Sequence, residues 1–498
     1  MTFAEPRPLL DTIRRTRVWC ATLVMLAAVA GCNAEPREGQ KDAAGQEKLP
    51  WEGVRLQLVV AEDGGLAEAI GRLRGEWRGS TGAELEVRAT SEDDLLAAEA
   101  LDADAVICPA ADLGELVQRQ WLAPLPSSVS TSDDLSASEV FEADKTHDAC
   151  WGSTSYAVSF GSPVFVCMYR ADLLKKLDRQ PPQSWQEYQE LAVLLNDAEQ
   201  LGLAGDAAGW SGAREPLGSG WAGLTLLARA ASDAKHHNHY SALFDIETMT
   251  PLIASPPFVR ALDELVAASR LSPNAQPLDP AAVRESFLQG RSGMAISWLA
   301  PRASQQPTGQ GEAGGQVALE IGFTELPGGS DVYNPKTRHW EQRRESRHVP
   351  LLGISGRIGC VSAKSTHHDA AWQLLAWLSG PKWSDRVAAE SAAVTVYRRS
   401  QLNASEQWVD VSIGGPAALE YAEVVERSLN ADEGLSAPRI PGRRRYLEAL
   451  DQAVAQAVRD ETTSQAALDA AAAAWAEITA ELGLERQRTA YRRSLGLR

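Results

Sequence analysis

Acidic side chains follow two of the strands that the sequence predicts. Glu62 and Asp63 come directly after an apolar, β-branched run, and Asp112 follows the short apolar run 105–108. Ligands of parallel sheets bind beyond the carboxyl ends of the strands, so these acids are candidate ligand contacts. Their carboxylates can accept hydrogen bonds from hydroxyl groups, or they can cap helices instead. Both interpretations stay open for all three acids.

Aromatic side chains are a second group of candidate ligand contacts, because the chain holds fifteen tryptophans with flat ring faces. Trp298 ends the phrase GRSGMAISW, which predicts a turn leading into a short buried strand. The same sheet rule places Trp298 at the carboxyl end of that strand, beside a ligand. Core packing is the alternative for any tryptophan. The positions of Trp185, Trp372 and Trp377 favour helix packing, so we exclude these three from the candidate contacts.

Two further clusters contain residue types that can bind a metal ion or an acidic ligand. His236, His237 and His239 could bind a metal, but their spacing does not place two of them on one helical face beside a third ligand. A solvated loop is the favoured interpretation, and we expect no metal and no cofactor. The three arginines 443–445 could bind an acidic ligand, or they could form a solvated helix start with one arginine reaching the ligand.

Four cysteines remain once Cys20 and Cys32 of the N-terminal segment are set aside. None of the four forms a CxxC pair or a zinc-like cluster. Three lie in apolar, strand-like stretches, which favours packing as small buried residues, although an oxidising compartment would permit a disulfide. They are Cys108, Cys150, Cys167 and Cys360.

Strands and helices alternate in the elements that must position these residues. This alternation predicts an α/β fold with mostly parallel sheets flanked by helices. The first strands are expected at 54–60, 85–88 and 105–108, with helices at 66–77, 91–100 and 113–121. The stretch 156–168 is extended and apolar but is interrupted by Gly161-Ser162-Pro163, which suits a crossing between two lobes.

The second half of the chain is mostly helical in pattern. Ser184 opens a capping box, and 301–347 is expected to be long surface loops with one strand at 317–323. Further helices are expected at 221–231, 257–268, 281–289, 369–378 and along the tail 446–482.

The N-terminal segment predicts export and anchoring. Basic residues precede the apolar run 18–30, which is too short to span a bilayer but suits a signal peptide. The run ends in Val-Ala-Gly-Cys, which resembles the lipobox of bacterial lipoproteins. We therefore expect a signal peptide at 1–31, lipidation of Cys32 and a polar tether at 32–50.

Composition limits the partners. The 498 residues are 44% hydrophobic and 23% charged, enough apolar material for two ordinary domains. The formal net charge is −18, and the first 31 residues carry four arginines against two acids, so the remainder is more acidic still. Such acidity argues against nucleic acid or an anionic membrane surface as the main ligand.

Several phrases, taken in order, resemble one family. They are ADAVICPAADLGELVQRQWLAPL, SYAVSFGSPVFVCMYRADLL, PPQSWQEYQELAVLL, SFLQGRSGMAISW and GCVSAKSTHHDAAWQLLAWLSG. Over nearly all of 54–498, the chain resembles the extracellular solute-binding proteins that include maltose-binding protein. It departs from them in MYRADLL, where an asparagine-lysine version is more usual, and in a longer loop between Trp298 and Val349.

The resemblance implies a type II periplasmic-binding-protein fold with a ligand cleft between two lobes. Lobe one would take 51–157 and 358–398, and lobe two 162–352 and 402–498. Hinge closure would trap a sugar or oligosaccharide for delivery to the membrane subunits of an ABC importer. The implied polar contacts are Glu62, Asp63, Asp112 and Ser162, and the implied aromatic contacts are Tyr156, Trp221, Trp298 and Tyr446.

We therefore expect a monomeric, lipid-anchored receptor on the periplasmic side of a bacterial membrane or at the cell surface, and not an enzyme. One alternative is a periplasmic carbohydrate-active enzyme with paired carboxylates, but GxSxG, HExxH, P-loop and dinucleotide motifs are absent. Another is a lipoprotein that presents its ligand to a sensor kinase.

Overall fold

The computed structural model describes residues 49–203, 209–271, 276–301, 319–410 and 412–497. The expected signal peptide, Cys32 and most of the tether lie outside these ranges. Within them, no helix is both long and apolar enough to cross a membrane.

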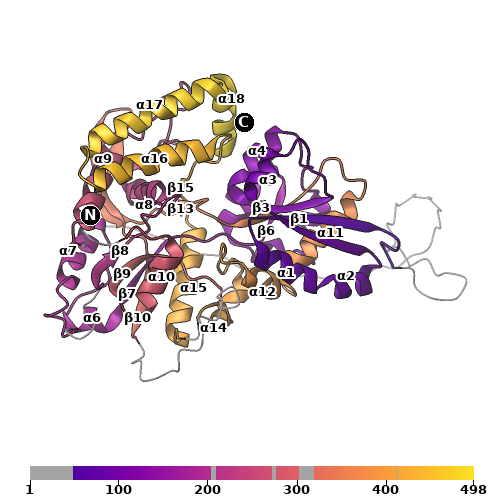
Figure 1. Cartoon of the computed structure of the whole chain (residues 1–498), viewed down its shortest axis with the longest axis horizontal. Coiled ribbons are helices and arrows are strands. Elements are labelled where there is room, and N and C mark those ends of the chain that lie inside the picture. Colours follow the sequence, from indigo (N-terminus) through magenta and orange to yellow (C-terminus); the bar gives the residue numbers. More distant parts are fainter. Residues whose placement is uncertain (1–48, 204–208, 272–275, 302–318, 411, 498) are drawn as a thin grey trace, which may run out of the picture. The chain divides into compact units, whose positions relative to one another are not determined.

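Five strands form the first sheet in the order β2-β1-β3-β14-β6. Figure 1 labels β1, β3 and β6 of this sheet. β1 pairs in parallel with β2 and β3, as expected, but β14 is antiparallel to both β3 and β6. The sheet is mixed because β14 enters from a distant chain segment instead of through a helical crossover. The strands are β1 (Arg55–Ala61), β2 (Glu84–Thr90), β3 (Ala105–Pro109), β6 (Ala157–Ser159) and β14 (Arg357–Val361).

Four strands form the second sheet in the order β10-β7-β9-β8. β8 is parallel to β9, whereas β7 is antiparallel to β9 and β10. The strands are β7 (Val166–Arg170), β8 (Ser211–Arg214), β9 (Ser292–Ser297) and β10 (Ile321–Glu325). Two short sheets pair β4 (Cys150–Trp151) with β5 (Thr154–Ser155), and β13 (Leu351–Leu352) with β15 (Leu435–Ser436).

The expectation of surface loops over 301–347 is wrong for 329–347. β11 (Gly329–Asn334) and β12 (His339–Arg347) form an antiparallel hairpin. The sequence HWEQRRESR hides this strand because it is polar on both faces, so the period of two has no apolar side to mark it. Residues 302–318 lie outside the described residues.

Helices flank both sheets, and their caps explain several boundaries. The Ser184 hydroxyl accepts a hydrogen bond from the Glu187 amide and opens α7, as the capping pattern predicts. Ser91 likewise caps α3, but that helix ends at Ala97 instead of Ala100. The expected long helix of the tail is broken between α16 and α17.

The helices of the first half are α1 (Gly64–Arg72), α2 (Arg74–Thr81), α3 (Glu92–Ala97), α4 (Leu113–Gln118), α5 (Ser127–Ser130), α6 (Ala171–Lys176), α7 (Trp185–Leu195) and α8 (Ala222–Ala234). Those of the second half are α9 (Pro256–Ser269), α10 (Pro280–Leu288), α11 (His368–Ser379), α12 (Ser384–Val387), α13 (Arg399–Leu402), α14 (Ser405–Trp408), α15 (Gly415–Leu429), α16 (Arg443–Val458), α17 (Ser464–Leu482) and α18 (Leu484–Ser494). Short turns are η1 (Ala110–Asp112), η2 (Ala137–Glu139), η3 (Asp144–Asp148) and η5 (Ala388–Glu390).

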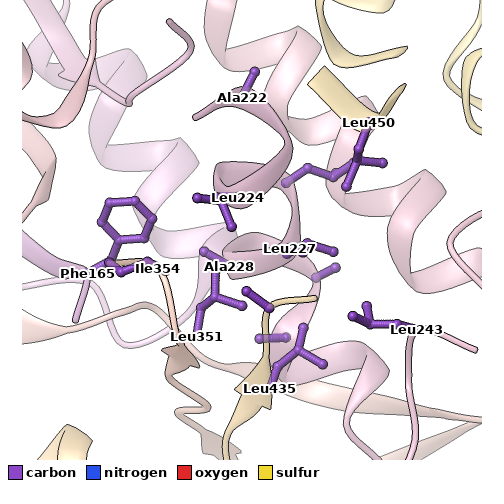
Figure 2. Close-up of a cluster of buried hydrophobic side chains, with 14 of the residues drawn as sticks. Phe165, Ala222, Leu224, Leu227, Ala228, Leu243, Leu351, Ile354, Leu435 and Leu450 are labelled. Atoms are coloured by element: carbon purple, nitrogen blue, oxygen red, sulfur yellow. The ribbon is translucent and has the colours of Figure 1, made fainter. Parts of the chain in front are cut away.

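A hydrophobic core joins α8 to the short sheet β13-β15. Figure 2 shows Leu224, Leu227 and Ala228 of α8 beside Leu351 and Leu435. The same buried cluster continues to β3 and β7, so the crossing segments are packed on both sides. Burial of this apolar surface is the main stabilising term for the region.

The cysteine expectation is confirmed at three positions. Cys108, Cys167 and Cys360 are buried free thiols in strands, and Cys150 is a partly buried free thiol. The histidine expectation is wrong for His236, which is buried and lies 3.1 Å from the Glu341 carboxylate. The rest of the loop is solvated as expected, because His237 and Asn238 are exposed and His239 is partly exposed.

Candidate functional site

Three parallel strands end at one edge of the first sheet, and an acidic side chain follows each of them. Glu62 and Asp63 follow β1, Glu92 begins the helix after β2, and Asp112 ends the turn η1 after β3. This is the edge where the sheet rule places ligands. We call these four residues the acidic edge.

Glu62 occupies a backbone conformation that non-glycine residues rarely adopt, with φ of 55°. Three contacts hold it there: its amide donates to the Thr90 carbonyl, its carbonyl accepts from Arg357 at 2.6 Å, and its carboxylate accepts from the Glu92 amide at 3.0 Å. Such strain persists only where the surroundings fix it, and it concentrates at functional sites.

Asp63 caps a helix with one carboxylate oxygen and binds side chains from distant segments with the other. Its Oδ1 caps α1 by accepting from the Leu66 amide at 3.0 Å. Its Oδ2 accepts from the Ser391 hydroxyl and lies 3.1 Å from Nε of Arg357, and both charged side chains are nearly buried. The helix-cap alternative is therefore confirmed for Asp63, and it does not exclude a ligand contact.

Asp112 is buried, with 2% of its surface exposed, and it is paired with Arg443. Nε of Arg443 donates to its Oδ1 at 3.0 Å, and the same guanidinium bonds Glu92. Burial raises the pKa of Asp112 to about 7, although Arg443 opposes that shift. Its Oδ2 is buried and has no hydrogen-bond partner among the described residues.

Three aromatic rings form a second group, which we call the aromatic cluster. Phe165 precedes β7, Trp298 follows β9, and Trp221 precedes α8. The ring centroid of Trp298 lies 5.9 Å from that of Phe165 and 5.6 Å from that of Trp221. Trp298 is only 5% exposed, whereas Trp221 is half-buried. Trp221 therefore presents more of its surface to a ligand than Trp298 does.

A two-residue segment connects the aromatic cluster with the acidic edge. The Ser391 hydroxyl donates to Asp63, and the carbonyl of the next residue, Ala392, accepts from the indole nitrogen of Trp298 at 3.3 Å. Asp63 at the edge of the first sheet and Trp298 at the end of β9 are thus bonded to neighbouring residues of one short segment.

The remaining sequence-predicted residues lie elsewhere. Ser162 is buried between the two sheets, where it donates to Asp148, and a Cβ at Gly356 would lie 1.9 Å from its hydroxyl oxygen. Tyr446 is fully buried, bonded to Thr479 within the packing of α16 and α17. Its ring is enclosed in this conformation, so we do not place it at a ligand.

Tyr156 is half-buried beside β5 and packs against the main core. Its exposed part leaves it available to a ligand.

A cavity of about 690 Å³ lies between β8 and the ends of α9 and α16, and none of the eight predicted contact residues lines it.

The arginine and histidine clusters also have defined partners. Arg443 reaches the acidic edge, while Arg444 pairs with Asp93 and Arg445 with Glu481. Among these three arginines, Arg443 is the one that contacts the acidic edge. Among the described residues, no group of histidine, cysteine and acidic side chains is arranged to hold a metal ion.

Sequence reasoning missed Glu92, Arg357, Phe165 and Ser391 as parts of this arrangement. Glu92 could have been found, because it follows the second strand just as Glu62 and Asp63 follow the first. Arg357 and Ser391 come from segments about 300 residues away from Asp63 in the chain, and no local pattern reports that proximity.

Residues 77–384 match the model of a family described as bacterial extracellular solute-binding protein. A search of curated proteins finds no match. Solved structures with similar folds include an ABC transporter solute-binding protein from Agrobacterium radiobacter K84 in complex with ribitol. It has a TM-score of 0.62 and 20% identity, and the alignment covers 86% of this chain and 100% of that chain.

Two others are a solute-binding protein from Agrobacterium vitis S4 with bound D-mannitol (TM-score 0.60, 18% identity, 86% and 99% covered) and the sugar-binding protein MalE from Xanthomonas citri (0.61, 18%, 86% and 98%). At this level of identity the similarity establishes the fold. The chain has the two-lobed α/β architecture of periplasmic binding proteins.

Proposed function

Because the chain belongs to the family of bacterial extracellular solute-binding proteins, we propose that it captures a sugar or polyol between its two lobes and delivers it to an ABC importer. Lobe one takes 51–157 and 358–398, and lobe two takes 162–352 and 402–498. The protein binds its solute without chemical turnover.

The observation that carries this proposal is the connection from Asp63 through Ser391 and Ala392 to Trp298. It links one carboxylate of the acidic edge with one ring of the aromatic cluster, and the two belong to different sheets. Aromatic faces stack on the C–H faces of sugars, and carboxylates accept hydrogen bonds from hydroxyl groups. A polyol or sugar needs both kinds of contact.

Charge supports a neutral, hydroxyl-rich solute. The acidic edge holds four carboxylates, and Arg357 and Arg443 pair with three of them. An anionic solute would meet the carboxylate of Glu62, which neither arginine pairs with, whereas hydroxyl groups can donate to this exposed carboxylate. The similar structures with bound ribitol, D-mannitol, alpha-D-tagatose and maltose fit this class of ligand.

The location follows from the N-terminal segment. Cys32, at the end of Val-Ala-Gly-Cys, carries the lipid, and the polar stretch 32–50 tethers the folded body outside the cytoplasm. From there the closed receptor would reach the membrane subunits of its importer.

A thermal-shift screen of the full chain tests the ligand class. The panel holds pentitols, hexitols, ketohexoses and maltose-type oligosaccharides, with amino acids and short peptides as control solutes. A solute that binds only the folded state raises the melting temperature by mass action, by about 2.7 kcal/mol in stability at a hundredfold excess over Kd. Stabilisation by a control solute and by no sugar or polyol would overturn the assignment. Recovery of the bound solute unaltered would support binding without turnover.

A further inference from the structure

A serine, a histidine and an aspartate form a hydrogen-bonded series beside the short sheet β13-β15. The Ser436 hydroxyl oxygen lies 2.8 Å from Nε2 of His147, and Nδ1 of His147 lies 2.6 Å from Oδ1 of Asp148. A nucleophile, a base and an acid that orients the base follow one another in this order at acyl-transfer sites. None of the three belongs to the acidic edge or the aromatic cluster.

Strand alternation explains how Ser436 is presented. Leu435 packs into the core beside Leu351 (Figure 2), and the amides of Leu435 and Ala437 donate to the Pro350 and Leu352 carbonyls. The side chain of Ser436 therefore points away from that core. Its amide points away from β13, where it can donate to an oxygen that develops negative charge at Ser436.

His147 and Asp148 belong to a single π-helical turn, η3. Such turns are rare and are frequent at functional sites. Arg439 fixes this turn by donating to the carbonyls of His147 and Asp148, and Gly353 approaches the imidazole so closely that a Cβ there would lie 3.3 Å from it. The imidazole is held by its hydrogen bonds with Asp148 and Ser436, and the backbone at Gly353 approaches it closely.

The charges favour a neutral imidazole that accepts a proton from Ser436. Burial lowers the pKa of His147, and the nearby Arg439 lowers it further. Burial acts to raise the pKa of Asp148, but its hydrogen bond with His147 and the charge of Arg439 outweigh that and hold the pKa below its usual value. Because the carboxylate accepts from Nδ1–H, the lone pair of Nε2 faces Ser436.

The Ser436 hydroxyl has one alternative acceptor, the Ala437 carbonyl at 3.0 Å. Nε2 of His147 is closer, at 2.8 Å, and the hydroxyl can rotate between the two. The same hydroxyl can therefore be either a nucleophile or a structural donor.

Ser436 and His147 line a pocket of about 230 Å³. Its walls include the apolar side chains of Leu243 and Leu495, and Lys235 brings a positive charge to it. A short acyl group fits the apolar walls. The Lys235 ammonium donates to the Tyr240 carbonyl at 3.0 Å, and its positive charge adds to the potential of the pocket.

We propose that Ser436 is a nucleophile, with His147 as its general base and Asp148 as the residue that orients the base, and that this pocket cleaves small carboxylic esters. Oγ forms a bond to the carbonyl carbon while its proton passes to Nε2. The bond to the alkoxide then breaks, and that proton leaves with the alcohol. Water attacks the acyl group, His147 takes the water proton, and the acid departs as Ser436 regains its hydrogen.

The test is labelling of the full chain with a serine-directed fluorophosphonate, followed by intact mass measurement and peptide mapping. We expect one adduct on Ser436 in the wild type and none in Ser436→Ala. His147→Gln removes the general base and should slow labelling about 100-fold or more. The matched control is Ser494→Ala, in the same pocket, where the lost hydroxyl donates to the Tyr491 carbonyl at 2.7 Å. It should label at the wild-type rate.

Release of p-nitrophenol from p-nitrophenyl acetate provides the second readout. Ser494→Ala should hydrolyse this ester at the wild-type rate. Ser436→Ala should hydrolyse it only at the background rate measured without an intact site. No adduct on Ser436 in folded wild-type protein would overturn the proposal and leave the three residues as structural hydrogen bonds. Equal labelling of wild type and His147→Gln would also overturn it. The mapping uses wild-type protein, so it does not depend on the folding of any variant.

Discussion

At the scale of single residues, the acidic edge makes Asp112 a titrating group near neutral pH. Burial raises its pKa to about 7, against about 3.9 in an unfolded chain. Between these values the folded state binds one more proton than the unfolded state, so the free energy of unfolding falls as pH rises. Asp112→Asn should remove this contribution.

Chemical denaturation at pH 5 and pH 8 measures the effect as the difference between wild type and Asp112→Asn. We expect the wild type to lose stability relative to the variant as pH rises. Asp93→Asn is the control, because Asp93 is exposed and its hydrogen bond with Arg444 lowers its pKa. Its stability difference should stay constant over this range. A constant difference for Asp112→Asn would refute the raised pKa.

Alanine substitutions of the two tryptophans of the aromatic cluster should differ in their effects on stability and on solute binding. Trp298 is nearly enclosed, so Trp298→Ala should lower the free energy of unfolding by about 3–5 kcal/mol. Trp221 is half-buried, and Trp221→Ala should weaken solute binding more than tenfold, about 2 kcal/mol, with a smaller loss of stability. Calorimetric titration and thermal melting of both variants measure this. Unchanged affinity in Trp221→Ala would remove that ring from the site.

The anchor depends on one thiol. Cys32→Ser should abolish acyl labelling and block processing of the N-terminal segment, because serine cannot form the thioether to the lipid. Metabolic labelling with a fatty-acid analogue, followed by electrophoresis, measures both. Normal labelling of Cys32→Ser would contradict the proposed lipoprotein, whereas the predicted loss would leave solute binding by the purified chain unchanged.

The residues that sequence could identify are those next to a recognisable strand end. Glu62, Asp63 and Asp112 lie at the sheet edge as predicted, since each directly follows a buried apolar run. Tyr446 could not be placed, because a helix start beside a cleft and a helix start inside a bundle have the same local sequence. Its enclosure depends on α17, which follows it in the chain.

At the scale of elements, α16 begins with three arginines although the positive end of the helix dipole disfavours them there. Acidic partners offset this cost, and Arg443 alone reaches two that are nearly buried. The start of α16 is thereby fixed to the ends of two strands of the first sheet. A sequence pattern reveals the arginines but not their partners.

Arg443→Ala should therefore be far more damaging than Arg445→Ala. Removing Arg443, which is 18% exposed, leaves a buried carboxylate unpaired, and breaking such a pair costs about 3–5 kcal/mol of stability. Arg445 and Glu481 are both exposed, so their pair contributes about 0–1 kcal/mol. Urea denaturation at pH 8 measures both. Equal losses would mean that the link between α16 and the acidic edge does not stabilise the fold.

Element boundaries were predicted best where a cap or an apolar period marks them. Ser184 and the helix at 369–378 are such cases, and the structure places α7 and α11 there. The hairpin of β11 and β12 was missed because its polar strands are stabilised by pairing with each other, which no one-dimensional pattern records.

At the scale of the whole molecule, capture of a solute requires two lobes that close on it. Contacts from both sheets meet at Ser391 and Ala392. A solute that contacts both the acidic edge and Trp221 would touch both sheets and favour the closed state. Ligands shift such an equilibrium only as far as their affinities for the two states differ. Closure is therefore the physical consequence of the proposed site.

Small-angle X-ray scattering of the full chain, titrated with the sugars and polyols of the screening panel, tests this claim most directly. We predict that at least one of them lowers the radius of gyration in a saturable way, while amino acids at the same concentrations leave it unchanged. A radius of gyration that no sugar or polyol changes at saturating concentration would contradict the capture of such a solute between the lobes.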